Sequence, residues 1–157
     1  MFKKVLKRVL LGLLVAFIAI QFVRPAKNLA TGPSPDDIIT KYNAPANVRQ
    51  ILATACYDCH SDTTRYPWYA EIQPTAWWLN QHVDHAKNEL NFSRFAAYAT
   101  RHKRQKLEAA IDEVTDKAMP LPSYLILHHD ARLSPEQIKA LTEWFEEILE
   151  KVEDEGG

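Results

Sequence analysis

Residues 55–69 read ACYDCHSDTTRYPWY, and the interpretation of the whole chain depends on this stretch. Cys56 and Cys59 are the only two cysteines in the sequence, and His60 follows them directly. A pair spaced this closely cannot cross-link distant parts of a fold, so we expect the cysteines to serve chemistry rather than stability. Three kinds of chemistry fit the pattern: covalent attachment of haem, tetrahedral binding of zinc, and dithiol redox exchange.

The pattern C-x-x-C-H is typical of c-type haem attachment. Thiols three positions apart lie about one helical turn apart, which matches the two vinyl groups of a haem. The residue after the second cysteine can then reach the iron beneath the ring. We therefore predict one covalent haem c on Cys56 and Cys59, with His60 as an iron ligand.

Two alternatives stay open. Cys56 and Cys59 could bind zinc together with His82 and His85, because a tetrahedral Cys₂His₂ set is chemically sound; either histidine is also a rival haem ligand. A redox dithiol would require a βαβ context, and no strand pattern surrounds the motif.

Met119 is the predicted second iron ligand, opposite His60. It is the only methionine besides Met1, and it lies in the segment AMPLPSY, residues 118–124. The two prolines of this segment do not fit inside a regular helix, so we expect a loop. A Met/His pair of axial ligands raises the haem potential and is typical of electron carriers. The alternative for Met119 is a role as an adaptable apolar packing residue.

The chain should be all-α, since it has only four glycines and few alternating β-branched runs. Apolar spacing predicts helices over residues 45–55, 75–90 and 100–117. In the second helix, the predicted apolar face holds Trp78, His82, His85 or Ala86, and Leu90. A closing helix follows Ser134, which can form a capping box with Gln137. We expect the first and last of these helices to bury their apolar stripes against each other.

The N-terminus predicts a membrane anchor that stays uncleaved, with a cleaved signal peptide as the alternative. Lys3, Lys4, Lys7 and Arg8 precede an apolar run over residues 9–20. A helix over residues 5–23 would span about 28 Å, close to the ~30 Å hydrocarbon core of a bilayer. Basic residues in front of the run would keep the first end in the cytoplasm. The prediction is a single-pass protein of the cytoplasmic membrane with its domain in the periplasm or outside the cell.

Charge differs between the two parts of the chain. Residues 1–33 hold six basic and no acidic residues, whereas the remainder holds 13 basic and 20 acidic residues, a formal charge of −7. A domain this acidic is poorly suited to nucleic acid, because binding to phosphates requires Lys and Arg. The expected partners are the membrane and an unknown redox protein, and nothing in the sequence indicates an enzyme active site.

Several motifs together resemble one known family. They are CYDCHSDTTRYPWY, QPTAWWLNQHV, ELNFS, MPLPSY, HHDARLS and ALTEW, all within residues 40–146. They resemble the bacterial haem-binding domain family of small, membrane-anchored c-type cytochromes. The resemblance implies a cytochrome-c-like helical domain with one covalent haem and His60 as axial ligand, and it supports Met119 opposite. The expected organisation is an anchor over residues 1–24, a linker over 25–36 and a haem-binding domain over 37–157.

Overall fold

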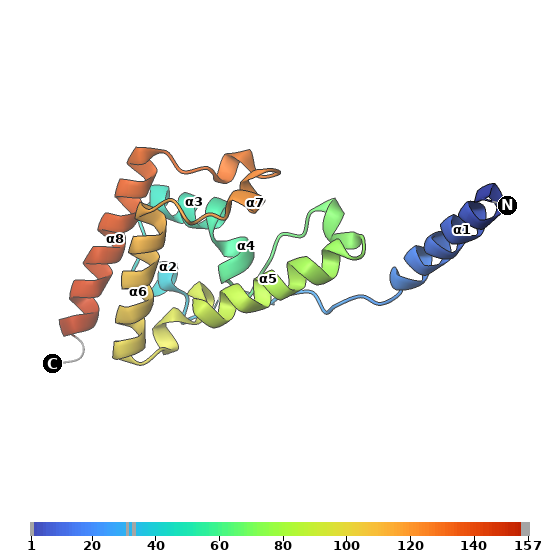
Figure 1. The fold of residues 1–157 in the computed structure, drawn as a ribbon. Coiled ribbons are helices and arrows are strands. Elements are labelled where there is room, and N and C mark those ends of the chain that lie inside the picture. Colours follow the sequence, from blue (N-terminus) through green and yellow to red (C-terminus); the bar gives the residue numbers. More distant parts are fainter. Residues whose placement is uncertain (1, 31, 33, 155–157) are drawn as a thin grey trace.

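The computed structural model describes residues 2–30, 32 and 34–154. This part of the chain is helical and contains no β-strand; a single antiparallel bridge joins Leu29 to Thr63. The prediction of an all-α chain is therefore confirmed. Figure 1 shows the long helix α1 at one end and the remaining helices gathered at the other.

Eleven helical segments follow each other among the described residues. Five are α-helices of ten or more residues: α1 (Phe2–Ile20), α3 (Ala46–Ala55), α5 (Thr75–Glu89), α6 (Thr100–Thr115) and α8 (Pro135–Asp154). Three are single turns: α2 (Ile38–Lys41), α4 (Tyr57–His60) and α7 (Pro122–Leu125). Three are 3₁₀ segments: η1 (Trp68–Glu71), η2 (Phe92–Ala97) and η3 (His129–Ala131).

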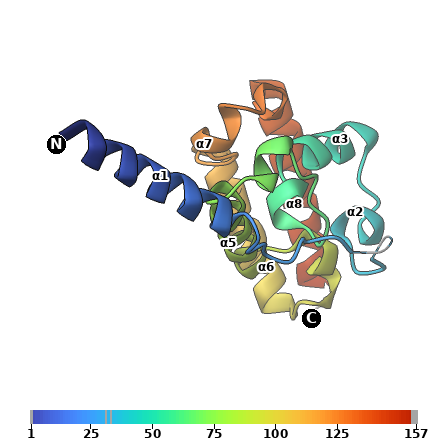
Figure 2. The ribbon, with the colours of Figure 1, turned by 90° about the vertical axis from the view of Figure 1, so that its right-hand side faces the viewer.

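Helix α8 supplies the largest share of the core. It lies antiparallel beside α6 and also packs against α3 (Figures 1 and 2). Its buried residues recur every three or four positions, as an amphipathic helix requires. They are Leu141, Trp144, Phe145, Ile148 and Val152. The expected packing of the first and last domain helices, α3 and α8, is confirmed.

The start of α8 is also as predicted. The Ser134 hydroxyl accepts a hydrogen bond from the backbone N–H of Gln137, at 3.2 Å. In return, the Gln137 side-chain oxygen accepts one from the backbone N–H of Ser134, at 2.9 Å. This reciprocal pair satisfies two donors that a helix start otherwise leaves unpaired.

The predicted apolar face of α5 is right at Leu90, which is buried, and wrong at Trp78. Ala76 and Val83 are the buried residues of this helix, whereas Trp78 is 47 % exposed. Trp78 instead packs on the surface against His82, with ring centroids 4.0 Å apart. Trp78 and His82 are one helical turn apart, so in the sequence they look like part of a buried face. In the structure their rings pack against each other on the surface and do not contribute to the core.

The end of α6 turns the chain toward the Met119 loop. Lys117 adopts a left-handed conformation, with φ of 58°. Its N–H donates to the carbonyl of Val114, and the N–H of Ala118 donates to that of Glu113. This pair of bonds is a Schellman motif, which usually places glycine where Lys117 lies. The helix therefore ends two residues before the predicted boundary at residue 117.

The predicted Pro-rich loop is partly helical. Pro122 begins α7, since its fixed φ suits the first position of a helix and its missing N–H is not needed there. The rest of the loop, which includes Met119, is not helical.

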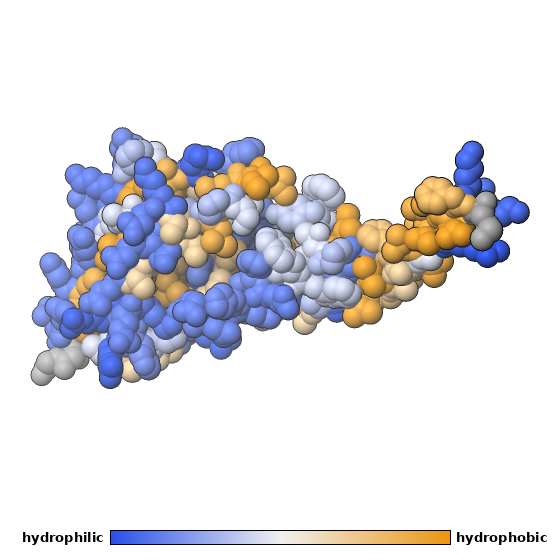
Figure 3. Space-filling view, viewed as in Figure 1, coloured by the Kyte–Doolittle hydropathy of each residue, from blue (hydrophilic) through white to orange (hydrophobic). Residues whose placement is uncertain are grey.

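Helix α1 projects away from the other helices and buries none of its residues (Figures 1 and 2). Figure 3 shows hydrophobic side chains gathered along it, in contrast to the mostly hydrophilic face of the helical domain. None of the described helices is long and apolar enough to span a bilayer.

The predicted single-pass anchor in the cytoplasmic membrane is therefore wrong. The four cations Lys3, Lys4, Lys7 and Arg8 lie inside α1 rather than before it. The uninterrupted apolar run, residues 9–20, covers only about 18 Å, well short of the ~30 Å hydrocarbon core.

The segment after α1 is bound to the domain over much of its length. The backbone carbonyl of Val23 accepts hydrogen bonds from the side chains of Gln73 and Trp77, at 2.8 and 2.9 Å. Further on, the Asn28 side chain donates to the carbonyl of Ser61 and to the hydroxyl of Thr64. This extended segment, residues 21–30, thus runs along α5 and fixes the loop that follows the C-x-x-C-H motif.

Candidate functional site

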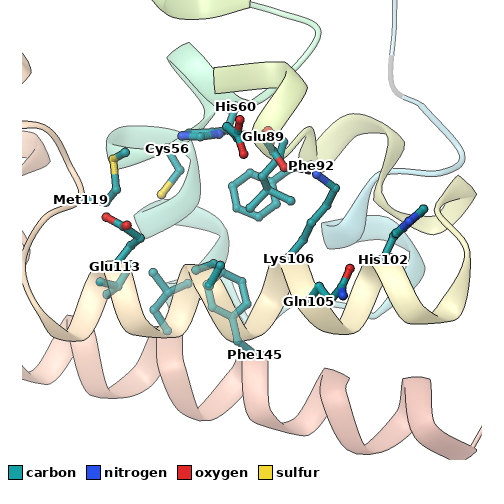
Figure 4. Close-up of a pocket in the computed structure, with 15 residues that line it drawn as sticks. Cys56, His60, Glu89, Phe92, His102, Gln105, Lys106, Glu113, Met119 and Phe145 are labelled. Atoms are coloured by element: carbon teal, nitrogen blue, oxygen red, sulfur yellow. Dashed lines mark hydrogen bonds between the residues drawn. The ribbon is translucent and has the colours of Figure 1, made fainter. Parts of the chain in front are cut away.

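A cavity of about 430 Å³ opens beside the C-x-x-C-H motif. Its size lies within the range of small-molecule and cofactor sites. Figure 4 shows Cys56, His60 and Met119 at one end of this cavity, with Glu113 beside Met119. Helices α6 and α8 form the opposite wall, and η2 contributes Phe92.

His60 is held by the backbone of a distant segment. Its Nδ1 lies 3.0 Å from the carbonyl oxygen of Leu90, the residue that follows α5. Only a protonated Nδ1 can donate to this carbonyl, so the bond leaves Nε2 unprotonated in the neutral ring. Burial also lowers the pKa of His60, which favours the neutral form. Nε2 of His60 is thus available as a metal ligand. The other ring nitrogen, Nδ1, is held by a hydrogen bond, as is usual for metal-bound histidines.

The two cysteines lie on one short turn. The N–H groups of Cys59 and His60 both donate to the carbonyl of Cys56, the N-cap residue of α4. Cys56 lines the cavity together with His60, whereas Cys59 is half-buried and is not among the lining residues. Cys56 and Cys59 form no disulfide with each other.

The acidity of the thiols argues against a redox dithiol. Burial raises the pKa of Cys56 to about 12 and that of Cys59 to about 11. A dithiol active in exchange requires the opposite, a lowered pKa that supplies thiolate near neutral pH. The raised pKa values of both thiols therefore disfavour rapid thiol exchange.

Met119 lies between two cavities. It borders the first one with Cys56 and His60, and it also borders a second one of about 890 Å³ next to α7. Its backbone N–H donates to the carbonyl of Glu113 at 3.0 Å, which fixes it directly after the Schellman turn of α6. The structure thus brings together three of the four predicted site residues around one cavity: Cys56, His60 and Met119.

The alternative zinc site is not assembled. No group of three or more potential His, Cys, Asp or Glu ligands is found within residues 2–30, 32 and 34–154. Neither His82 nor His85 lines the cavity of Cys56 and His60. The His82 Nδ1 instead faces the carbonyl of Trp78 at 2.9 Å, which is a local contact within α5.

Asp58 is an organising residue that sequence reasoning missed. It lies between the two cysteines and is only 8 % exposed. Its carboxylate accepts bonds from the backbone N–H, Nε and Nη2 of Arg65, and a fourth from the hydroxyl of Tyr124 at 2.8 Å. An acidic residue inside the motif, seven positions before an arginine, is the only sequence signal for this cluster. The role of Leu90 has no signal, because a backbone carbonyl acts there.

The residues fit a haem. The cavity has an apolar wall that could cover the faces of a flat cofactor, formed by Leu90, Phe92, Val114, Leu141 and Phe145. Polar side chains line other parts of it; they are Glu89, His102, Gln105, Lys106 and Glu113. Among them, His102, Gln105 and Lys106 could donate hydrogen bonds to the carboxylate groups of a haem. The neutral imidazole and the thioether are the axial donor types found in cytochromes c.

Comparison with known families supports the same class of protein, one that binds haem. The sequence matches the haem-binding domain family over residues 15–147, which is most of the chain. The chain therefore belongs to this family, and haem is its cofactor. Searches among curated proteins and solved structures found no match.

Proposed function

We propose that the chain is a monohaem c-type cytochrome that transfers single electrons. In this proposal Cys56 and Cys59 form thioether bonds to the haem, while His60 and Met119 bind the iron from opposite faces within a cytochrome-c-like domain. The haem supplies a one-electron redox couple when bound. Cys56, Cys59, His60 and Met119 would hold and orient that group, and the apolar residues of the cavity would exclude water from it.

The observation that carries the proposal is the fixed orientation of His60. The Leu90 carbonyl holds Nδ1, so Nε2 is the free nitrogen in the cavity that Cys56 and Met119 also line. An electron carrier needs little change of structure between its oxidation states, and two protein ligands on rigid supports favour this. The proposed role is that of a carrier rather than an enzyme.

The proposed partner is another redox protein. The formal charge of −7 on residues 34–157 favours a partner with a basic docking surface. Such charge complementarity accelerates encounter and makes it sensitive to salt. The same charge disfavours nucleic acid as a partner.

The test is made on the full chain produced together with haem-maturation machinery. We expect haem that stays with the denatured chain on a gel, sharp absorption bands after reduction, and a redox titration that follows a one-electron curve. Replacing Cys56 and Cys59 together by alanine should abolish covalent haem, and Met119→Ala should retain it while converting the iron from low spin to a form open to added ligands. A colourless wild-type chain would contradict the proposal.

A haem-based sensor is the second candidate, because Met119 lies between two cavities and its side chain has room to leave the iron. Carbon monoxide binding separates the two functions. A reduced wild-type chain that binds carbon monoxide as readily as Met119→Ala would favour the sensor, whereas slow or weak binding favours the electron carrier.

A further inference from the structure

The loop that carries Met119 is fixed at both ends. At its first end, the N–H groups of Ala118 and Met119 both donate to the carbonyl of Glu113 in α6. At its second end, Tyr124 of α7 donates its hydroxyl hydrogen to Oδ2 of Asp58, at 2.8 Å. Only four residues separate Met119 from Tyr124, so the second bond restricts where Met119 can lie.

The acceptor of this bond belongs to the C-x-x-C-H turn itself. Asp58 lies between Cys56 and Cys59, and its nearly buried carboxylate is immobilised by three bonds from Arg65. The Tyr124 hydroxyl therefore connects the segment that carries Met119 to the turn that carries the cysteines and His60. This connection joins residues 66 positions apart in the sequence.

We propose that Tyr124 is a positioning residue that keeps Met119 on the iron, acting through its hydrogen bond to Asp58. The inference rests on the proposed haem site and adds to it the device that holds the sixth ligand. Without the bond, α7 loses its direct connection to the turn that carries the cysteines and His60, and Met119 can leave more often. The bond thus favours the electron carrier over the sensor.

The hydroxyl can be separated from the ring. The Tyr124 ring stacks on His128, with centroids 4.0 Å apart and planes 7° from parallel. Phenylalanine would keep this stacking and remove only the hydroxyl group. Asp58 would retain its three bonds from Arg65, so Tyr124→Phe should leave no unpaired buried charge and should still fold.

The chain offers a matched control in Tyr57, which is Asp58's neighbour. The Tyr57 hydroxyl donates to Oδ1 of Asp37, also at 2.8 Å. This second tyrosine–carboxylate bond connects the motif to the start of α2 rather than to the Met119 loop. Tyr57→Phe should therefore cost a comparable amount of stability without changing the hold on Met119.

The experiment measures how fast added imidazole replaces Met119 in the oxidised, haem-loaded full chain. In Tyr124→Phe we expect this rate to rise about ten- to a hundredfold. This is the change in an equilibrium constant that follows from the loss of one hydrogen bond to a charged group. Tyr57→Phe should stay within about twofold of wild type, because its hydroxyl lies outside the Met119 loop. Hydrogen exchange over residues 118–127 should also become faster in Tyr124→Phe alone.

The outcomes separate this inference from the proposed function. Covalent haem on the denatured chain tests the proposed function, whereas the imidazole rate tests the role of Tyr124. Equal rates in Tyr124→Phe and Tyr57→Phe would overturn the inference and leave the proposed cytochrome intact. A wild-type haem that Met119 does not bind would overturn the inference together with the proposed role of Met119 as iron ligand, while covalent haem on Cys56 and Cys59 would still stand. If Tyr124→Phe fails to load haem, Asp58→Asn weakens the same bond from its acceptor side; an unchanged rate there would equally overturn the inference.

Discussion

Helices α1 and α8 have nearly equal length, 19 and 20 residues, but differ in how much of their surface is buried. Helix α1 carries apolar residues on all sides of its second half and buries none. Helix α8 alternates apolar and charged residues and buries five. The difference shows that a periodic stripe with a partner, and not apolar content, places a helix in the core. The following predictions test this contrast, in order of decreasing expected effect.

Phe145→Ala should have the largest effect. Phe145 is 1 % exposed, contacts Phe92 and lines the cavity beside the C-x-x-C-H motif. Truncating a buried phenylalanine costs about 3–5 kcal/mol, because apolar burial is lost and a void remains. Denaturant unfolding of the variant should show this loss of stability. A loss below about 1 kcal/mol would mean that α8 does not form the core described here.

Asn28→Ala should have a medium effect and mark where the packed region begins. The Asn28 amide donates to Ser61 and Thr64, and its oxygen accepts from Lys87 at 2.7 Å. Removing these bonds should cost about 1–3 kcal/mol in unfolding free energy. Lys27→Ala is the neighbouring control, since its ion pair with Glu71 is exposed and such pairs contribute ~1 kcal/mol or less. Equal losses in both variants would contradict a specific role of Asn28.

Acid should weaken the packed region through His60, whereas α1 has no histidine. Burial lowers the pKa of folded His60, so the unfolded chain binds more protons once the pH falls below about 6.5. Stability is therefore complete above that pH and is lost as the pH falls toward the folded pKa. Unfolding of the haem-free chain, with Cys56 and Cys59 replaced by alanine, should show this loss. His60→Gln should reduce it and the exposed His102→Gln should not; identical profiles would contradict the assignment.

Phe17→Ala should have the smallest effect and is the counterpart of Phe145→Ala. Phe17 lies in α1 and is 46 % exposed, so its removal creates no cavity. Surface substitutions of this kind usually change stability by less than about 0.5 kcal/mol. A loss of more than about 2 kcal/mol in the same unfolding experiment would show that α1 packs against the domain in solution.

Features that depend on residues close together in the sequence could be predicted, whereas features that depend on distant residues could not. The capping box of Ser134 and Gln137 is local, and so are the helical periods of α3 and α8; all were predicted. The left-handed Lys117 was missed because glycine usually marks that position. The membrane anchor was wrong because residues 5–23 were counted as one spanning helix, whereas Lys7 and Arg8 lie within that range and leave an apolar run over residues 9–20 alone.

The candidate site shows the same limit. The motif itself identifies Cys56, Cys59 and His60, and the scarcity of methionine points to Met119. The supports of these residues come from far away in the sequence: the Leu90 carbonyl for His60, and Tyr124 for the turn that contains Asp58. Only the fold brings such pairs together, and a backbone carbonyl leaves no mark in the identity of its residue.

The hydrogen bond between His60 and Leu90 can form only after Leu90 has been synthesised. The two residues are 30 positions apart, and the carbonyl belongs to the later one. At a synthesis rate of about 5–20 residues per second, His60 exists for roughly 2–6 s before Leu90 is made. During that interval the imidazole can rotate freely and either ring nitrogen can carry the proton. The tautomer suited to iron is therefore selected late, when the chain has already passed the end of α5.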